Sequence, residues 1–400
     1  MNKRLIINIK TVCLILLILP FIQQRSMLEF PTWLVELYKI GTILSSTIIY
    51  IIAFNQHRKY RKSKVFYTML LFWGTYIFVT LVNSFGNLIN VLYVVYYSIA
   101  VVLLLLIEYK KNRERLFFSL SFIYGTFIFL NWLLYILYPD GLYQISSGHI
   151  GHSTLLLGDD NAIAYVAIPG LICLSLYSYF KYKKIKIFVW IEIIITEWTL
   201  ISVWAASGMI AVGLFGAALA YIEYIGNINP KVIISIFTVI AISIFMGLSN
   251  RFISGLIVKY LHKDITLTGR TYLWMHAFDM ILMKPLLGYG GYFKYGSWKL
   301  GAFSYSCHTT FLQLLIDGGI LLFSIFCYIT YTSYKNMSRN KDGRISPMLS
   351  IGLGCMFLNY ITEYAYLVHF NIIITIMLLI GDYPTLVNSR RVNVATNKVS

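Results

Sequence analysis

Long apolar runs separated by short polar turns occupy most of this chain. A helix needs about 20 mainly apolar residues to cross a bilayer, and the sequence contains about twelve candidate runs. The turns within 186–225 and 347–385 are very short, so the pattern predicts ten to twelve transmembrane helices and an all-α, polytopic membrane fold. The runs lie near residues 5–22, 34–54, 65–83, 87–108, 116–138, 160–180, 186–205, 207–225, 231–249, 306–333, 347–364 and 366–385.

Composition supports this prediction. The 400 residues are 58% hydrophobic and only 12% charged, and the mean hydropathy is +0.71. A soluble domain of this length does not bury so much apolar surface, so the bilayer must act as the solvent. We expect one membrane domain over 1–400, and membrane lipids are its first partner.

Positive charge is concentrated in the turns on one side of the predicted bundle. The chain has 33 Lys and Arg against 16 Asp and Glu. If the N-terminus is cytoplasmic, twelve spans place every basic cluster in the cytoplasm, which is the positive-inside rule. The charge therefore predicts two cytoplasmic termini, and we expect no nucleic-acid binding. The clusters are at 55–64, 109–115, 181–186, 334–344 and the tail S-R-R.

Two longer loops are predicted on the outer side. The smaller one, 139–159, has no Lys or Arg, whereas 250–305 has seven. Cations in an outer loop oppose the positive-inside bias, which favours a functional role. Long loops also escape that rule, so the alternative that these cations have no function stays open. The seven residues are Arg251, Lys259, Lys263, Arg270, Lys284, Lys294 and Lys299.

The larger loop contains a segment with helical periodicity. Thr268 is a suitable N-cap, and Lys284–Pro285 with the following glycines ends the pattern. The helix is expected to lie on the outer membrane surface. Arg270 falls in its first turn, where a guanidinium and unpaired backbone N–H groups favour phosphate. Its predicted apolar face consists of Leu273, Trp274, Ala277, Phe278, Ile281 and Leu282.

Motifs in this region resemble those of a known superfamily. The stretches G-R-T-Y-L-W-M-H-A-F-D-M-I-L-M-K-P-L-L-G-Y-G (269–290) and C-H-T-T-F-L-Q-L-L-I-D-G-G-I (307–320) are similar to the paired motif of O-antigen ligases and Wzy-type polysaccharide polymerases. That motif is roughly G-R-x3-W…P-x-x-G-x-G, then H-N-x-[FY]-L-Q-x5-G at the start of a span. G-D-D-N-A-I-A (158–164), with Asn161, resembles the opening of an earlier span in the family.

The resemblance implies a GT-C-like membrane glycosyltransferase that needs neither metal nor cofactor. Its substrates would be glycans carried on undecaprenyl diphosphate at the outer face of a bacterial cytoplasmic membrane. Joining repeat units, as in capsule, exopolysaccharide or O-antigen synthesis, is the first function that it implies. Transfer of a finished glycan to a lipid or protein acceptor is the second. A flippase and a chain-length regulator are the expected pathway partners.

The chain departs from the family pattern in two places. The family's Asn after histidine is Thr309 here, which keeps a polar side chain. Many relatives also have Ser-Arg between two earlier spans, whereas this chain has A-A-S-G-M at 205–209. An arginine expected near Ser207 is therefore missing, and Arg251 or the loop lysines are its candidate replacements.

Glycosyl transfer from a diphosphate needs a base for the acceptor hydroxyl and positive charge for the leaving group. Histidine has an unperturbed pKa of about 6.5 and can act as the base, so His308 and Arg270 are the predicted catalytic residues. No D-x-D pair is found in the outer loops, and we assign no metal ligands. His308 as a simple helix cap is the alternative. The predicted substrate-binding residues are Arg251, Lys284, Asn161, Gln313 and Trp274.

Acidic residues also occur within the predicted spans. Asp317 is nine residues after His308, about 180° around a helix and about 13 Å deeper, so it is not expected to orient that ring. It is expected to meet another helix or, with Gly318–Gly319, to mark a local break. Glu192, Glu197 and Glu363 are candidates for function because intramembrane charge is costly, but we favour a structural role for them.

Functions from other classes remain open at this point. A flippase for lipid-linked oligosaccharide would suit twelve spans with buried carboxylates. However, the two halves show no internal duplication, which many transporters have, and the polar residues concentrate in one outer loop. A purely structural partner of a synthesis complex would tolerate replacement of Arg270 and His308.

Overall fold

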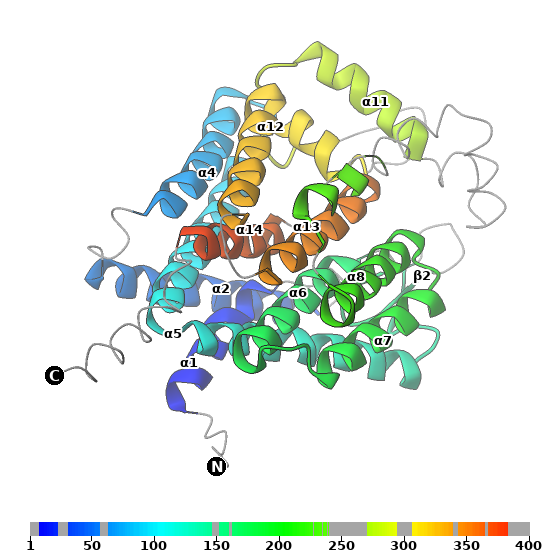
Figure 1. The fold of residues 1–400 in the computed structure, drawn as a ribbon. Helices are drawn as coiled ribbons and strands as arrows, with labels where there is room; N and C mark the ends of the chain where they lie inside the picture. Colours follow the sequence, from blue (N-terminus) through cyan, green and yellow to red (C-terminus); the bar gives the residue numbers. More distant parts are fainter. Residues whose placement is uncertain are drawn as a thin grey trace.

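The structure is a computed structural model, and it describes residues 8–22, 31–56, 63–145, 152–159, 162–226, 228–233, 235–237, 239, 270–293, 306–338, 343–364 and 367–382. Helices make up most of them (Figure 1). The N-terminal half contains α1 (Ile9–Ile18), a 3-10 turn (Leu19–Phe21), α2 (Thr32–Asn55), α4 (Lys64–Val82) and α5 (Leu88–Leu137). The chain then continues with α6 (Ile163–Tyr182), α7 (Ile187–Ser202), α8 (Ala206–Tyr224), α11 (Arg270–Met283), α12 (Thr310–Met337), α13 (Ile345–Thr362) and α14 (Leu367–Asp382).

The prediction of an all-α polytopic fold is confirmed. Among the described residues, seven helices are long and apolar enough to cross a membrane, and shorter apolar helices accompany them. Eleven of the twelve predicted runs coincide with described helices, and 231–249 lies mostly outside the described residues. One short antiparallel hairpin joins β1 (Tyr143–Ile145) to β2 (His152–Thr154) within the smaller predicted outer loop.

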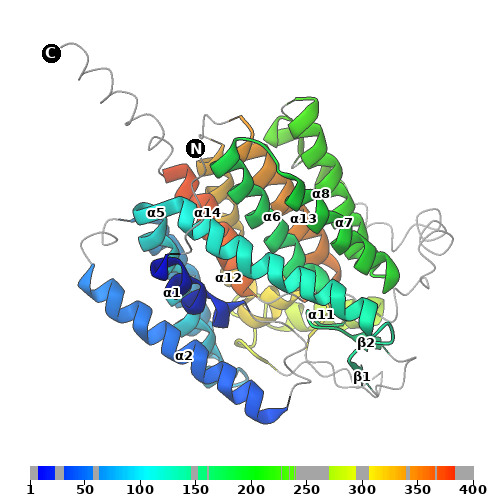
Figure 2. The same cartoon turned by 90° about the horizontal axis from the view of Figure 1, so that it is seen from below.

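The helices form a central group and a periphery. Nearly every residue of α6, α13 and α14 is buried, and Figure 2 shows α5 crossing in front of these helices and α7 and α8 beside them, with α2 further out. The outer helices expose apolar side chains, such as Ile51 of α2 and Ile194 of α7. Exposed aliphatic side chains of this kind suit a lipid environment, where backbone groups must be satisfied within the helices.

Contacts between helix ends define two opposite faces of the bundle. On one face the guanidinium of Arg113 lies 4.9 Å from the ring of Phe180, and Arg344 pairs with Glu223 at 3.0 Å. These contacts belong to the basic clusters that were predicted to be cytoplasmic. The other ends of the same helices lie on the opposite face, where the backbone N–H of Thr310 donates to Glu363.

Helix α5 contains two of the predicted spans, and they are joined at Asn112. This residue has φ −158° and ψ 90°, an extended conformation that most residues can adopt. Its side chain accepts a 2.9 Å hydrogen bond from the backbone N–H of Arg115, as an N-cap does. Glu108 pairs with Arg115 and Lys111 across this joint. The joint is therefore stabilised by residues close to it in sequence.

Helix α12 is also broken, at Gly319, where φ is +60°. The break predicted from Gly318–Gly319 is thus present. The segment 285–290 supplies the missing backbone partners: the N–H groups of Ile320 and Leu321 donate to the carbonyls of Pro285 and Leu286. In return, the N–H groups of Tyr289 and Gly290 donate to the carbonyls of Ile316 and Asp317. These four bonds satisfy groups that a helix end leaves unpaired.

Helix α11 lies outside the main bundle, against the first part of α12 (Figure 1). It ends at Met283, just before the predicted Lys284–Pro285 stop. The predicted apolar face is divided, because Trp274 and Ala277 are buried whereas Phe278 and Leu282 are exposed. The buried side chains form a second, small core with residues of α12, with Cys307 just before α12 and with Tyr289 after α11. Its buried members are Trp274, Ala277, Met280, Tyr289, Cys307, Leu312 and Ile316.

Candidate active site

His308 lies immediately before α12, on the face opposite the basic clusters. Its backbone has φ +54°, which is uncommon for a residue with a side chain. Such a conformation costs about 1–3 kcal/mol and persists only when its surroundings impose it, which is frequent at functional sites. About one third of the side chain is exposed. The imidazole is therefore held in a defined place and remains accessible.

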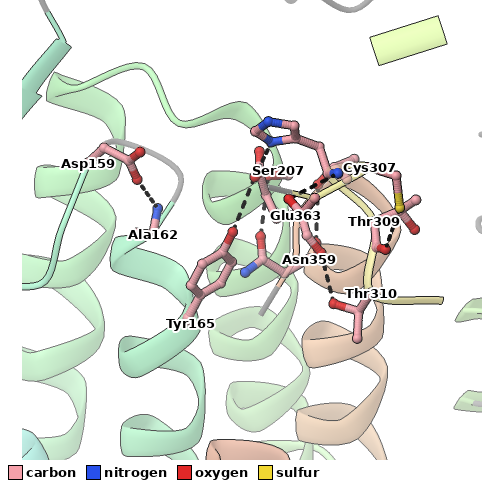
Figure 3. A network of polar contacts seen from close by, with 12 residues as sticks. Asp159, Ala162, Tyr165, Ser207, Cys307, Thr309, Thr310, Asn359 and Glu363 are labelled. Carbon is pink, nitrogen blue, oxygen red and sulfur yellow. Dashed lines mark hydrogen bonds and ion pairs between the residues drawn. The ribbon is translucent and has the colours of Figure 1, made fainter. Parts of the chain in front are cut away.

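Glu363 is the carboxylate partner of this histidine. Its Oε2 lies 3.5 Å from Nδ1 of His308, and its side chain is only 1% exposed. The same oxygen accepts a 3.2 Å hydrogen bond from the hydroxyl of Tyr165, at the start of α6 (Figure 3). A nearly buried carboxylate thus faces a partly exposed imidazole.

The local sequence explains why the two residues meet. Glu363 ends α13, and its carbonyl accepts hydrogen bonds from both the backbone N–H and the hydroxyl of Thr310, at 3.1 and 2.9 Å (Figure 3). The hydroxyl of Thr309 donates to the carbonyl of Tyr360 at 3.3 Å. The two threonines that follow the histidine therefore join the start of α12 to the end of α13.

The contact places Nδ1 of His308 beside the carboxylate of Glu363, 3.5 Å from Oε2. An Nδ1–H directed at the carboxylate leaves Nε2 without a proton, so that Nε2 is the basic nitrogen. The pair has the arrangement of a general base with an orienting group.

Ser207 lies close to the same network. Its hydroxyl donates to Oδ1 of Asn359 at 3.4 Å, and Asn359 is one turn before Glu363 on α13 (Figure 3). Nδ2 of Asn359 is buried and has no partner among the described residues. The place near which the sequence resemblance implied an arginine is therefore close to the histidine–glutamate pair, and Ser207 provides a hydroxyl there.

Sequence analysis favoured a structural role for the intramembrane glutamates. The structure places Glu363 against the candidate base, which makes a role in the site a proposal for this residue. For Asp317 the expectation was right: its carboxylate accepts a hydrogen bond from Tyr76 of α4 and does not contact His308. Sequence contained one relevant signal, since the predicted topology puts Glu363 and His308 at the same outer end of their spans.

Cys307 is excluded as a nucleophile by its environment. Its side chain is fully buried, and burial raises the pKa of its thiol to about 12. The thiol donates weakly to the carbonyl of Thr309 at 3.4 Å. Because the thiolate is the reactive form, this residue serves in packing.

The other predicted site residues have different surroundings. The ammonium of Lys284 lies 4.2 Å from the ring centroid of Phe85 and 5.0 Å from that of Tyr289, in cation–π contacts. Trp274 is 3% exposed and belongs to the small core. Gln313 is equally buried, and its amide bonds to the protein at both ends. Their predicted roles in binding substrate stay predictions.

Arg270 is the first residue of α11, so its backbone occupies the helix N-terminus. Its side chain, Arg251 and Asn161 lie outside the described residues. Trp274, one turn after Arg270, packs in the same small core as Cys307, the neighbour of His308. The two predicted catalytic residues are therefore on segments that share one core.

Comparison with known families agrees with the motifs. The model described as O-antigen ligase matches residues 153–327. The resemblance is confirmed. The matched region includes α6, α7, α8 and α11, His308 and the first part of α12. It ends before Glu363, which completes the pair from outside the match.

A search of curated proteins finds no significant match to the chain. The O-antigen ligase match and the apolar helices together support a multi-pass membrane enzyme of the glycan ligase or polymerase type.

Proposed function

We propose that this protein is a polysaccharide polymerase that joins undecaprenyl-diphosphate-linked oligosaccharide units at the outer face of a bacterial cytoplasmic membrane. The observation that supports it most is the His308–Glu363 pair, in which a buried carboxylate faces an accessible imidazole within a glycan-ligase family. Capsule, exopolysaccharide or O-antigen synthesis would provide such substrates.

The proposed reaction begins at the acceptor hydroxyl. Nε2 of His308 takes its proton while the hydroxyl oxygen attacks the anomeric carbon of the donor glycan. The bond between that carbon and the diphosphate oxygen breaks, and lipid diphosphate leaves with the electron pair. Glu363 stabilises the imidazolium, which later releases its proton to water. A positioned base of this kind contributes about 10²–10⁴-fold to a rate.

Negative charge on the departing diphosphate requires a counter-charge. We assign this role to Arg270, because a guanidinium in the first turn of α11 places a two-pronged donor at the positive end of the helix dipole. In this scheme protein cations stabilise the leaving group without a metal ion. Arg251 is proposed to supply the charge that Ser207 lacks.

The side of the membrane follows from charge. His308 and Glu363 lie at helix ends opposite the ends that have Arg113, Lys181 and Arg344. If the positive-inside rule holds for these clusters, the site faces the outside. A lipid-linked glycan would reach it there after a flippase has moved it, and a chain-length regulator is the other proposed pathway partner.

The test is reconstitution of purified protein with a lipid-diphosphate-linked repeat unit, with and without EDTA. Chain growth that is unaffected by EDTA is expected. The His308→Ala substitution should lower the rate of glycan transfer at least about 100-fold, and Glu363→Gln should lower it about 10-fold or more. Arg270→Lys should also lose activity, because lysine keeps the charge but loses the planar fork.

Matched controls separate chemistry from folding. Glu197→Gln removes another intramembrane carboxylate that has no described contact with His308 or Glu363, and it should leave the rate unchanged. A stably inserted His308→Ala protein that still makes long polymer would contradict the proposal.

Two alternatives predict different products. A ligase would transfer one finished glycan to a lipid or protein acceptor and give a single product instead of a ladder; the family name favours testing this first. A flippase would cause lipid-linked units to accumulate on the inner leaflet after gene loss, whereas loss of a polymerase would cause accumulation outside.

A further inference from the structure

We infer that a hydrogen-bond relay from Tyr76 through Asp317 and Gln313 to the backbone of Cys307 positions His308 for reaction. This inference rests on the proposed function, since it gives Gln313, Asp317 and Tyr76 the role of positioning residues for that base. None of the three needs to touch substrate.

The relay begins next to the histidine. Oε1 of Gln313 accepts a 3.3 Å hydrogen bond from the backbone N–H of Cys307, the residue before His308. Gln313 also donates its own backbone N–H to Thr309 at 3.0 Å, on the other side of the histidine. The strained backbone of His308 therefore lies between two residues that one glutamine holds.

The glutamine amide is itself fixed by a carboxylate. Nε2 of Gln313 donates to Oδ1 of Asp317 at 2.8 Å, one turn further along α12. The other carboxylate oxygen accepts a 2.8 Å hydrogen bond from the hydroxyl of Tyr76 on α4. Each of these three side chains is 3% exposed or less. Because the backbone N–H of Cys307 can only donate, it fixes the amide with its oxygen toward Cys307 and its Nε2 toward Asp317.

Asp317 also contacts the segment 285–290, which follows α11. The backbone carbonyl of Asp317 accepts a 2.8 Å hydrogen bond from Gly290, in the segment that follows α11. Gly291 next to it donates to the hydroxyl of Thr80 on α4 at 3.0 Å. Asp317 is thus linked to Cys307 through Gln313, to the segment after α11 through Gly290, and to α4 through Tyr76. The contact of Gly291 with Thr80 is one turn further along α4.

Burial distinguishes positioning from substrate binding. Gln313 is only 3% exposed, and both ends of its amide bond within the protein, so little of its polar surface is accessible to a sugar. Loss of the relay should therefore move His308 and leave the surface that binds substrate intact. A misplacement of about 1 Å in a reacting group can lower a rate about 100-fold.

Gln313→Met tests the relay, because methionine has a similar length but makes no amide hydrogen bonds. We expect kcat to fall at least about 10-fold while KM stays within about twofold. Cys307 provides a second readout that does not need activity, since its thiol is now fully buried. In a background that keeps only this cysteine, maleimide labelling should become at least about 10-fold faster.

Two further variants sharpen the test. Gln313→Glu combined with Asp317→Asn exchanges the acid and the amide. The carboxylate at position 313 then accepts from the backbone N–H of Cys307 and from the amide N–H at position 317, and the amide oxygen at position 317 still accepts from Tyr76. This double variant should recover most of kcat and the protection of Cys307. Tyr124→Phe is the matched control, because it removes an equally buried hydroxyl contact, to His369 at 2.9 Å, outside the relay.

The outcomes are distinct. Unchanged kcat and unchanged labelling in Gln313→Met would overturn the inference, and so would a rise in KM with Cys307 still protected, which would indicate substrate binding. Faster labelling of Cys355, buried in α13, to the same extent would indicate general loosening and also overturn it. If the unmodified protein transfers no glycan, the proposed function fails, whereas the labelling still tests the relay.

Discussion

The two helix interruptions of this molecule, in α5 and in α12, differ in what holds them. At Asn112 the backbone is extended, and the partners of the joint lie within eight residues of sequence. At Gly319 the backbone has a positive φ, and the partners come from 285–290, about thirty residues earlier. The first interruption turns the chain between two spans. The second fixes a loop segment onto the membrane bundle.

This difference explains why the candidate site lies beside α12. A break inside a membrane helix is tolerated where other protein groups satisfy the freed backbone. Here the groups that do so follow α11 directly, so the break brings α11 and the approach to His308 to one place. The α5 joint has no such partner segment among the described residues, and it lies on the basic face.

Replacement of Gly319 should have the largest effect. An added Cβ would lie 2.3 Å from the carbonyl carbon of Leu286, and a backbone with φ +60° and ψ −162° is adopted almost only by glycine. We expect Gly319→Ala to lower the free energy of unfolding by about 3 kcal/mol or more and to abolish glycan transfer. Thermal unfolding in detergent and the reconstituted assay would measure both.

Gly74→Ala is the control for that prediction. Gly74 lies within α4 with no atom near the position of an added Cβ. Alanine is about 1 kcal/mol better than glycine inside a helix, so stability should stay equal or rise. The four backbone hydrogen bonds between 285–290 and the break in α12 are called the clamp. A Gly319→Ala protein as stable as this control would show that the clamp is dispensable.

At the α5 joint, Glu108→Gln should have the next largest effect on stability. Glu108 and Arg115 are 10% and 13% exposed and pair across the joint. Loss of this charge should cost about 2 kcal/mol, because a mostly buried guanidinium loses its partner. Activity per folded molecule should stay unchanged, in contrast to the α12 break.

Lys111→Ala is the corresponding control. Lys111 is the exposed partner of the same carboxylate, at 54% side-chain exposure. Its loss should cost less than about 1 kcal/mol, as for surface ion pairs. A fall of kcat in Glu108→Gln would mean that the two interruptions are coupled, and would contradict the distinction drawn between them.

The same contrast shows what sequence could predict. The spans were predictable because a bilayer fixes both the length and the polarity of a crossing helix. The α12 break was predictable too, since two adjacent glycines after an aspartate interrupt an otherwise apolar run. These features depend on local sequence, and the structure reproduces them within a few residues.

Features that depend on distant contacts were not predictable. Glu363 is 55 residues from His308, and the predicted topology puts both at the outer ends of their spans without indicating that they meet. The divided apolar face of α11 has the same origin: Phe278 and Leu282 have helical spacing but are exposed, whereas Trp274 and Ala277 are buried in the small core shared with α12. Which apolar residues become core is decided by what packs against the helix.

Thr80→Val tests the α4 side of the clamp. The hydroxyl of Thr80 accepts a 3.0 Å hydrogen bond from the backbone N–H of Gly291, and valine has nearly the same shape. The unpaired N–H should cost about 1 kcal/mol, and kcat should fall modestly because 285–290 is held less firmly. Thr75→Val is the control, since its hydroxyl bonds only within α4 and faces outward. Equal kcat in the two variants would indicate that the clamp needs no support from α4.

Cys307→Ala should have the smallest effect at neutral pH and a specific effect in alkali. The thiol makes one weak hydrogen bond, so stability at pH 7 should change by less than about 1 kcal/mol. Burial raises the pKa of this thiol to about 12, whereas an unfolded cysteine ionises near pH 8.5. The folded state therefore binds the proton more tightly, and its advantage is complete below about pH 8.5 and lost as pH rises toward 12.

Cys307→Ala removes that alkaline loss. Unfolding midpoints in mixed micelles, measured from pH 7 to pH 10, should therefore fall less steeply for Cys307→Ala than for the unmodified protein. Equal slopes would mean that water reaches the thiol, and that the small core between α11 and α12 is open beside His308. A smaller slope for the variant would show that this core stays closed while the neighbouring imidazole remains accessible, as the positioning of the base requires.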